Sequence, residues 1–298
     1  MRHTDRLRAT PKAFRRLTGI TPAAFDRLLA QLTPRYERAE ARRKDRPGRR
    51  RRPGGGRKRR PGGGRRHTLV LADRLLMLLI SYRTDVTHAS LGFLFGVDDS
   101  AVGRTINPLQ PLLAGIFRIP ERKVELTEQE IRELFFDATE RPTRRPKRGQ
   151  RASDSGKKER HTITTQVVVV RRRKAPGPGA KPRRVRIAAV SASFPGQVHD
   201  TRVDDETRVV GPPGAGRTGD TGYVGTGLET PTTKPPGGEL TARPKAGNRR
   251  VSRRRIVAEH GIGKMKVWRI AAERYRNPVR RHTLIRKNVA GLQNLMCA

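Results

Sequence analysis

Three short motifs of this 298-residue chain, which is rich in Lys and Arg, each contain a single acid. The acids are Asp137 in Phe-Phe-Asp-Ala-Thr, Asp220 in Gly-Asp-Thr-Gly-Tyr, and Glu259 in Val-Ala-Glu-His-Gly-Ile-Gly-Lys-Met-Lys. Carboxylates are the oxygen ligands that Mg²⁺ prefers in proteins, together with water. When carboxylates converge they can hold two metal ions that act on a phosphodiester. The motifs therefore indicate metal-dependent chemistry on a polyanion.

Each acid also has an ordinary structural interpretation when it is taken alone. Asp137 fits a turn at a strand end, Asp220 fits a turn among glycines, and Glu259 can pair with Arg255 one helical turn earlier. Asp200, in Phe-Pro-Gly-Gln-Val-His-Asp, competes with Asp220 for the second place. It also fits a helix start, where a carboxylate stabilises the helix dipole. Chain order favours Asp220, because that residue lies where a fourth strand should end.

The composition indicates a polyanionic partner. Lys plus Arg number 67 against 27 Asp plus Glu, which gives a formal net charge of +40. Such a charge predicts strong, salt-dependent attraction to nucleic acid. The longest apolar run, Leu69 to Ile80, is interrupted by two charged residues and is shorter than the roughly 20 residues that a membrane span needs. We therefore expect DNA as the partner and no membrane contact.

The N-terminus and the cysteine content favour the cytoplasm. No uninterrupted apolar stretch follows Met1, so a secretory signal is not expected. The one cysteine, Cys297, allows no intrachain disulfide and no thiol cluster for zinc. These features suit a chain that folds in a reducing compartment.

The N-terminal part is expected to be helical and then strongly basic. Residues 1–40 form a helical segment, in which Thr21 caps a helix that ends near Pro34. A linker of Arg, Lys, Pro and Gly follows at 41–67 and contains a duplicated eight-residue motif at 49–64. The linker is interpreted either as a cationic arm that lies along phosphates or as a solvated spacer.

Residues 68–120 fit a compact helical domain with a helix-turn-helix pattern. The small Gly92 allows close contact between two helices, and Gly96 stands at the tight turn that separates them. Apolar residues then form the inner face of the following helix. The alternative is an ordinary three-helix bundle. In the helix-turn-helix interpretation the outward residues that contact DNA are Ser100, Arg104 and Asn107.

Residues 121–298 change to an α/β pattern. Strands are predicted over 131–137, 161–170 and 185–193, followed by a helix over 198–210, a short fourth strand before residue 220 and a long basic helix from 241. An antiparallel meander of three strands, with the fourth strand beside the first, brings Asp137 next to Asp220. This arrangement resembles a ribonuclease-H-like catalytic domain, here preceded by an all-α helix-turn-helix domain.

Several stretches together resemble the DDE transposases of bacterial insertion sequence family 5, which are related to Harbinger-like DDE superfamily endonucleases. They include Leu-Thr-Gly-Ile-Thr-Pro-Ala-Ala-Phe, Ser-Gly-Lys-Lys-Glu-Arg-His-Thr, Phe-Pro-Gly-Gln-Val-His-Asp, Gly-Asp-Thr-Gly-Tyr-Val-Gly-Thr and Ala-Glu-His-Gly-Ile-Gly-Lys-Met-Lys. The resemblance spans almost the whole chain, with its motifs in order. It implies a bacterial protein of the cytoplasm, associated with the nucleoid.

The resemblance also implies roles for individual residues. Asp137, Asp220 and Glu259 match the three acids that bind Mg²⁺ or Mn²⁺ in a two-metal site. His199 and Asp200 match a motif that lies in the vicinity of the active site. The basic residues interpreted as DNA or supporting contacts are Lys157, Lys158, His161, Arg255 and Lys266.

These observations predict a transposase that binds terminal inverted repeats, cuts DNA with metal-activated water and transfers the resulting 3′-hydroxyl to target DNA. Synapsis of two element ends implies a homo-oligomer, at least a dimer. Ala138 stands where the family usually has Gly, and Gly261 stands where it usually has Ala. These departures leave two alternatives: a decayed, inactive transposase copy, or a non-catalytic helix-turn-helix DNA-binding protein.

Overall fold

A computed structural model describes residues 3–44, 69–147, 150–173 and 185–297. The chain divides into two compact units, Met1–Ile116 and Phe117–Ala298, and each is described by itself. Most of the predicted basic linker and all of residues 174–184 lie outside the described residues. Among the helices described, none has the length and hydropathy that crossing a bilayer requires.

The first unit consists of helices arranged around one buried helix. Its elements are α1 (His3–Arg8), α2 (Pro11–Thr18), α3 (Pro22–Lys44), α4 (Leu71–Thr84), α5 (His88–Phe95), α6 (Asp99–Ile106) and α7 (Leu109–Phe117), the last of which reaches the second unit. Buried residues run almost continuously along α4. Asp73 of α4 accepts hydrogen bonds from the backbone N–H and the hydroxyl of Thr4, at 2.9 and 2.6 Å. This pair attaches α1 to the centre of the unit.

Helix α3 begins as predicted but does not end near Pro34. The amide of Ala24 donates to the Thr21 hydroxyl at 3.2 Å, which confirms the predicted cap. The helix then continues through Pro34 to Lys44. A proline inside a helix costs about 3 kcal/mol, because it removes one hydrogen bond and crowds the preceding turn. Packing on both sides of the proline offsets this cost: Leu32 is fully buried, and the Tyr36 hydroxyl accepts a hydrogen bond from Arg74 of α4.

Helices α5 and α6 have the close approach that the helix-turn-helix pattern predicts. A Cβ on Gly92 would lie 2.5 Å from the carbonyl oxygen of Val97, so only glycine fits there. Gly96 ends α5 in the left-handed region, with φ of 65°. The sequence pattern predicts that the helix after this turn runs from Asp99 to about Leu109, but α6 ends at Ile106. Asn107 still has helical dihedral angles, but Pro108 has no backbone N–H with which to continue the hydrogen bonds of α6, and α7 begins after this break.

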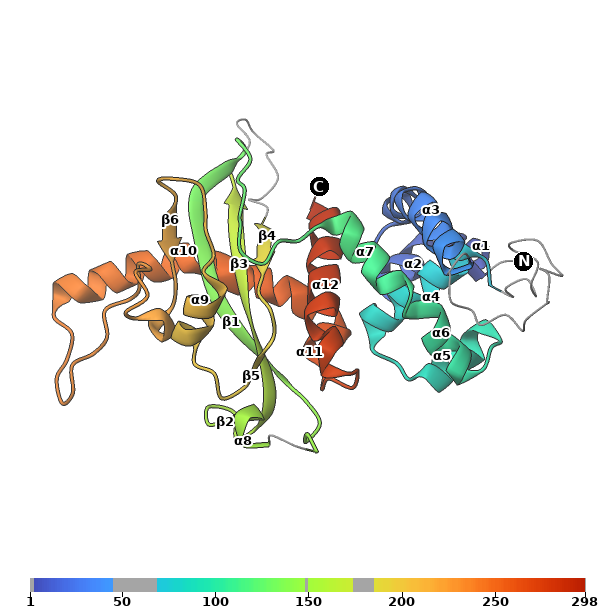
Figure 1. Ribbon diagram of the computed structural model, residues 1–298. Helices are drawn as coiled ribbons and strands as arrows, with labels where there is room; N and C mark the ends of the chain where they lie inside the picture. The colour runs from blue at the N-terminus through green and yellow to red at the C-terminus, as the bar shows by residue number, and fades with distance from the viewer. Residues whose placement is uncertain (1–2, 45–68, 148–149, 174–184, 298) are drawn as a thin grey trace. The chain divides into compact units, whose positions relative to one another are not determined.

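The second unit contains a mixed β-sheet (Figure 1). Its strands are β1 (Glu130–Pro142), β2 (Asp154–Ser155), β3 (Arg160–Arg172), β4 (Val185–Val190), β5 (Phe194–Pro195) and β6 (Gly216–Thr218). Strand β3 pairs antiparallel with β1 on one side and with β4 and β5 on the other, while β6 pairs parallel with β1. The predicted meander, with a fourth strand beside the first, is confirmed. Strand β1 runs well beyond the predicted end at Asp137.

The helices that the described residues of this unit form are α8 (Gln150–Ser153), α9 (Asp200–Thr207), η1 (Thr221–Tyr223), α10 (Ala242–Lys266), α11 (Arg269–Ala272), η2 (Val279–Arg281) and α12 (His282–Cys297). Helix α9 is shorter than the predicted 198–210, because His199 caps its start and Arg208 ends it at a φ of 48°. Helix α10 packs against the sheet at Gly261, where a Cβ would lie 2.6 Å from Cγ2 of Val169. This contact explains why the chain has glycine in a helix interior.

Alternation along β1 places its side chains on two different faces. Leu134 and Phe136 join a buried cluster with Tyr223. Phe135 and Asp137 pair with Val169 and Val167 of β3. Directly paired residues of neighbouring strands share a face. Asp137 therefore lies on the face of the sheet that α10 covers at Val169.

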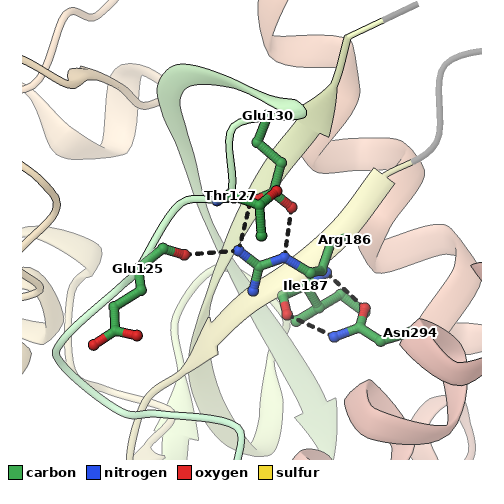
Figure 2. A network of polar contacts seen from close by, with 6 residues as sticks. All are labelled: Glu125, Thr127, Glu130, Arg186, Ile187 and Asn294. Carbon is green, nitrogen blue, oxygen red and sulfur yellow. Dashed lines mark hydrogen bonds and ion pairs between the residues drawn. The ribbon is translucent and has the colours of Figure 1, made fainter. Parts of the chain in front are cut away.

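A polar network ties the sheet to its surroundings at the start of β1 (Figure 2). The guanidinium of Arg186 on β4 donates to both carboxylate oxygens of Glu130, at 2.6 and 2.9 Å, and to the backbone oxygen of Glu125 at 2.9 Å. The amide side chain of Asn294 on α12 bonds both backbone groups of Ile187 at 2.9 Å. Paired, hydrogen-bonded charges of this kind restrict motion between the elements that carry them. The network thus positions β1, β4 and α12 relative to one another.

Candidate active site

The pairing of β1 with β6 brings the first two predicted acids together. Phe135 and Thr218 are register partners in this parallel pair. Asp137 lies two residues beyond Phe135, and Asp220 lies two residues beyond Thr218. Parallel strands advance at the same rise per residue, so the two acids lie at the same level of the sheet. Because β1 continues to Pro142, Asp137 is a strand residue and the interpretation as a turn residue is wrong.

Short local contacts hold the loop that carries Asp220. Its carboxylate caps η1 by accepting a hydrogen bond from the backbone N–H of Gly222 at 2.9 Å. Tyr223 is fully buried in the next position, and its hydroxyl accepts a hydrogen bond from Nε2 of Gln166 at 3.4 Å. Nε2 of Gln166 also donates to Asp204 of α9 at 2.9 Å. These bonds join β3, α9 and the acidic loop.

Asp200 belongs to the same group of acids. It occupies the first turn of α9, after the cap residue His199, so the interpretation as a helix-start residue is confirmed. A Cβ on Gly222 would nevertheless lie 2.7 Å from Oδ2 of Asp200 and 3.0 Å from Oδ1 of Asp220. Both carboxylates therefore contact the same face of one glycine. The absence of a side chain at residue 222 is what leaves room for them.

The acids change each other's protonation. Burial raises the pKa of Asp137 to about 6, with further upward contributions from the negative charges of Asp220, Asp200 and Glu259 and an opposing one from Arg255. The pKa of Asp200 is also raised, first by burial and then by Asp220. Desolvated like charges disfavour the ionised state of a carboxyl. A cation placed among these carboxylates would relieve the repulsion.

Arg255, which lies on the same helix as Glu259, connects that residue to the group of aspartates. Nη2 of Arg255 lies 2.8 Å from Oε1 of Glu259, and Nη1 lies 3.9 Å from Oδ2 of Asp137. The predicted pairing of Glu259 with Arg255 one turn earlier is confirmed. The side chain of Glu259 is 56% exposed, whereas that of Asp137 is 17% exposed. Arg255 thus lies between a buried acid and a solvent-facing one.

The donor chemistry of this group fits a hard divalent cation. Asp137, Asp200 and Asp220 offer only carboxylate oxygens, which Mg²⁺ and Mn²⁺ accept as ligands. In the part of the chain that the structure describes, no three Asp, Glu, His or Cys side chains are already placed so that they could hold a metal ion. The carboxylates lie near one another without forming a finished ligand set. A bound cation would have to draw them closer.

A family match covers the segment that carries these acids. Residues 136–294 match the model of the DDE superfamily endonucleases. The chain belongs to this family. Residues 67–118 match the helix-turn-helix of DDE superfamily endonuclease, which assigns α5 and α6 to that motif. An ordinary three-helix bundle is therefore not the correct interpretation of this region.

Two curated relatives resemble the DDE endonuclease over most of their lengths. A probable transposase for insertion sequence element IS702 of Microchaete diplosiphon is 29% identical over 96% of this chain and 94% of its own length. A putative transposase for insertion sequence element IS112 of Streptomyces albus G is 29% identical over 85% of this chain and 83% of its own length. No solved structure gives a significant match.

The basic residues predicted near the acids occupy different places in the DDE endonuclease. Lys157 and Lys158 are exposed on the turn between β2 and β3, and the positive charge of Lys157 opposes the raised pKa of Asp200. Lys266 is exposed at the end of α10, two turns beyond Glu259. Lys157 and Lys266 therefore lie on separate elements. Lys157 is in the turn before β3, and Lys266 is at the end of α10, the helix that carries Glu259.

His161 lies in a separate cavity. Its Nδ1 atom is buried without a hydrogen-bond partner among the described residues. The cavity has a volume of about 890 Å³, lies beyond the end of β1 and is not lined by any of the four acids described above. The arginines that line it beside His161 are Arg145, Arg151, Arg160 and Arg274.

The predicted DNA contacts of the helix-turn-helix lie on α6 and at its end. Ser100 and Arg104 are exposed, and Nη2 of Arg104 donates to the Ser100 hydroxyl at 3.0 Å. Asn107 follows α6 as its C-cap and is half-buried. The spacing of these three residues places them on one side of the helix axis.

Sequence reasoning missed two polar contacts of the site. One is the contact of Arg255 with Asp137, which joins residues on different elements. The other is the pair of bonds from Gln166 to Asp204 and Tyr223. A signal for the second was present, since Gln166 is the one amide in an otherwise Thr- and Val-rich strand. Buried polar side chains need partners, so such a residue indicates a polar contact beneath the sheet.

Proposed function

We propose that this DDE endonuclease is the transposase of an insertion sequence, of the family 5 type related to Harbinger-like enzymes. It binds the terminal inverted repeats of its element, cuts a DNA strand at the element end and transfers the new 3′-hydroxyl to target DNA. Support comes from the family match and from two relatives named as transposases. The observation that carries the proposal is the meeting of Asp137, Asp200 and Asp220 beside β6.

The sheet topology supports a ribonuclease-H-like catalytic domain. Strands β1, β3 and β4 are antiparallel neighbours, and β6 lies parallel beside β1. Helix α10 follows β6 in the chain and carries the third acid of the motif. In this arrangement acids that are far apart in sequence come from one strand, one strand end and one helix.

Asp137, Asp220 and Glu259 are the proposed ligands of Mg²⁺ or Mn²⁺ in a two-metal site, with Asp200 beside them. When bound, the metal ions supply stabilisation of charge on the scissile phosphate and activation of the attacking water. The chain's own contribution is to hold the acids and neutralise charge. Arg255 places a fixed positive charge between Asp137 and Glu259, where negative charge of the phosphate would otherwise be repelled.

Recognition of the element ends is assigned to the first unit. Ser100, Arg104 and Asn107 of the helix-turn-helix would contact the inverted repeats, while Lys157 and Lys158 would contact DNA beside the acids. A transposition reaction joins two element ends to one target. We therefore propose that the active form is a homo-oligomer, at least a dimer.

The test is nicking of DNA that carries the element's own inverted repeats. Purified full-length chain with Mg²⁺ or Mn²⁺ should cut at the repeat and leave a 3′-hydroxyl, and EDTA should stop the reaction. Asp220→Asn should lower the nicking rate by about 100-fold or more while the affinity for repeat DNA stays within about twofold. Asp200→Asn should lower nicking in the same direction.

A matched control is Asp205→Asn, which removes an exposed carboxylate from α9, the helix that begins with Asp200. Its nicking rate should equal that of the unsubstituted chain. Tight binding of repeat DNA by the unsubstituted chain, without nicking in either metal, would instead identify a DNA-binding protein that lacks catalysis or an inactive transposase copy.

A further inference from the structure

Helix α10 carries far more positive charge than the site needs. Along its 25 residues it has nine Lys or Arg and a single acid, Glu259. Two of the arginines have carboxylate partners close to the acids: Arg254 pairs with Glu133 and Glu229, and Arg255 pairs with Glu259 and Asp137. The excess charge on the rest of the helix is not used by the contacts described so far.

The two halves of α10 have different surroundings. From Val251 onward, buried residues recur along the helix where it packs on the sheet. Residues 242–250 contain no buried side chain, and Figure 1 shows this first part of α10 extending past β6. It is supported by Asn248, whose side-chain amide bonds the backbone N–H and oxygen of Thr232 at 2.8 and 2.9 Å. The projecting half is thus an exposed, anchored helix.

Three exposed cations form one row along this helix, which we call the α10 row: Lys245, Arg249 and Arg253. They are spaced four residues apart, and side chains at that spacing lie above one another on the same face. Lys245 pairs with Glu239 at 3.2 Å, but both side chains are at least half exposed. Arg249 and Arg253 form no ion pair or hydrogen bond with another described residue.

The charges of the α10 row repel one another. Like charges four residues apart on a helix destabilise it by about 0.2–0.5 kcal/mol per pair. The row contains two such pairs, between residues 245 and 249 and between 249 and 253, and buries no apolar surface in exchange. A polyanion laid along this face would neutralise the repulsion. Charge complementarity therefore selects a phosphate backbone as the occupant of the face.

We propose that the α10 row binds the phosphate backbone of the DNA duplex whose strand reaches the acids, without reading its sequence. The inference rests on the proposed function, since it extends the DNA path away from that same site. The helix rises about 1.5 Å per residue, so Lys245 lies about 21 Å along the axis from Glu259. At about 3.4 Å per base pair, Lys245 at the far end of the row would contact the duplex roughly six base pairs from the cut.

The experiment measures DNA affinity of the full-length chain as a function of salt, in EDTA. The test variant replaces all three residues, as Lys245→Gln, Arg249→Gln and Arg253→Gln. Each lost phosphate contact reduces the slope of log affinity against log salt by about 0.9, so the slope should fall by about 3. Affinity near 0.15 M salt should fall at least about 10-fold, equally for repeat DNA and for random duplex.

A second triple variant controls for bulk charge. It replaces Arg122, Lys123 and Arg280 by Gln, which are exposed cations of the same unit on segments that carry none of the acids. Its slope should stay close to that of the unsubstituted chain. A third variant, with Lys245→Arg, Arg249→Lys and Arg253→Lys, keeps the charges and should retain binding. Circular dichroism should show the same helix content for all three.

An unchanged slope in the glutamine variant, or an equal change in the bulk-charge control, would overturn the assignment of the row. The salt dependence of DNA binding tests the α10 row independently of the proposed nicking activity, because binding is measured without metal. If the unsubstituted chain never nicks DNA, the proposed function fails while the slope still tests the row. If it nicks DNA and the slope is unchanged, the row alone fails.

Discussion

Phe135 of β1 and Thr218 of β6 are register partners in a parallel pair of strands. This pairing decides the position of two of the proposed catalytic acids, since Asp137 and Asp220 each follow two residues after a partner. A shift of one residue would turn one of the two side chains to the opposite face. The proposed site thus depends on the registration of a three-residue edge strand.

Gly222→Ala should lower nicking with little effect on folding. The added Cβ would lie 2.7 Å from Oδ2 of Asp200 and 3.0 Å from Oδ1 of Asp220, so one or both carboxylates must move. We expect a loss of about 10- to 100-fold in nicking rate and weaker Mn²⁺ binding by calorimetry, because displaced ligands hold metal less well. Gly247→Ala, whose Cβ would meet no atom within 4 Å, is the control. Full activity of Gly222→Ala would show that the two carboxylates need not occupy these positions.

Gly261→Ala and Gly263→Ala should change stability in opposite directions although both lie in α10. A Cβ at residue 261 would lie 2.6 Å from Cγ2 of Val169, and overpacking of this kind costs about 1–3 kcal/mol. A Cβ at residue 263 would meet no atom within 4 Å, so alanine should raise the free energy of unfolding by up to about 1 kcal/mol through helix propensity. Urea denaturation measures both.

Val169→Ala provides a further check of the contact with Gly261. If the two residues collide in Gly261→Ala, the double variant should recover part of the lost free energy of unfolding, giving a coupling of at least about 0.5 kcal/mol. Additive effects, or equal effects of alanine at 261 and 263, would contradict the close approach of α10 to β3.

His282 should make the free energy of unfolding depend on pH below about 6.5. Burial, with the positive charges of Arg286 and Arg141, lowers its pKa to about 2. The unfolded state, with a pKa near 6.5, binds a proton between these values while the folded state does not. The contribution of His282 to the free energy of unfolding is therefore fully present above about pH 6.5. It decreases as the pH falls below 6.5, by at most about 1.4 kcal/mol per pH unit.

Chemical denaturation at several pH values between 7 and 5 checks this expectation. His282→Gln, which can keep a hydrogen bond to Ser193, should show a smaller loss of stability on acidification than the unsubstituted chain. His260→Gln, which removes an exposed imidazole from α10, is the control substitution. Equal pH dependence of the three proteins would contradict a neutral, buried His282.

Local sequence patterns were sufficient to predict most helices and strands. They did not predict the helix and strand boundaries that depend on packing. Strands at the positions of β1, β3 and β4 were predicted, and the glycine spacing predicted the turn between α5 and α6. Pro34 misled the prediction of α3, because the contact of Tyr36 with Arg74 is invisible in local sequence. Gly261 stands where the family usually has Ala, and only the contact with Val169 shows why glycine is required.

The sequence by itself determined which acids the chain has, their order along strand, strand end and helix, and the surplus of cations, because these depend on residue type and short-range periodicity. Only the tertiary structure decided that Asp200 shares Gly222 with Asp220 and that Arg255 lies between Glu259 and Asp137. Both relationships depend on strand register and on how α10 packs on the sheet, which are set by contacts between residues far apart in the chain.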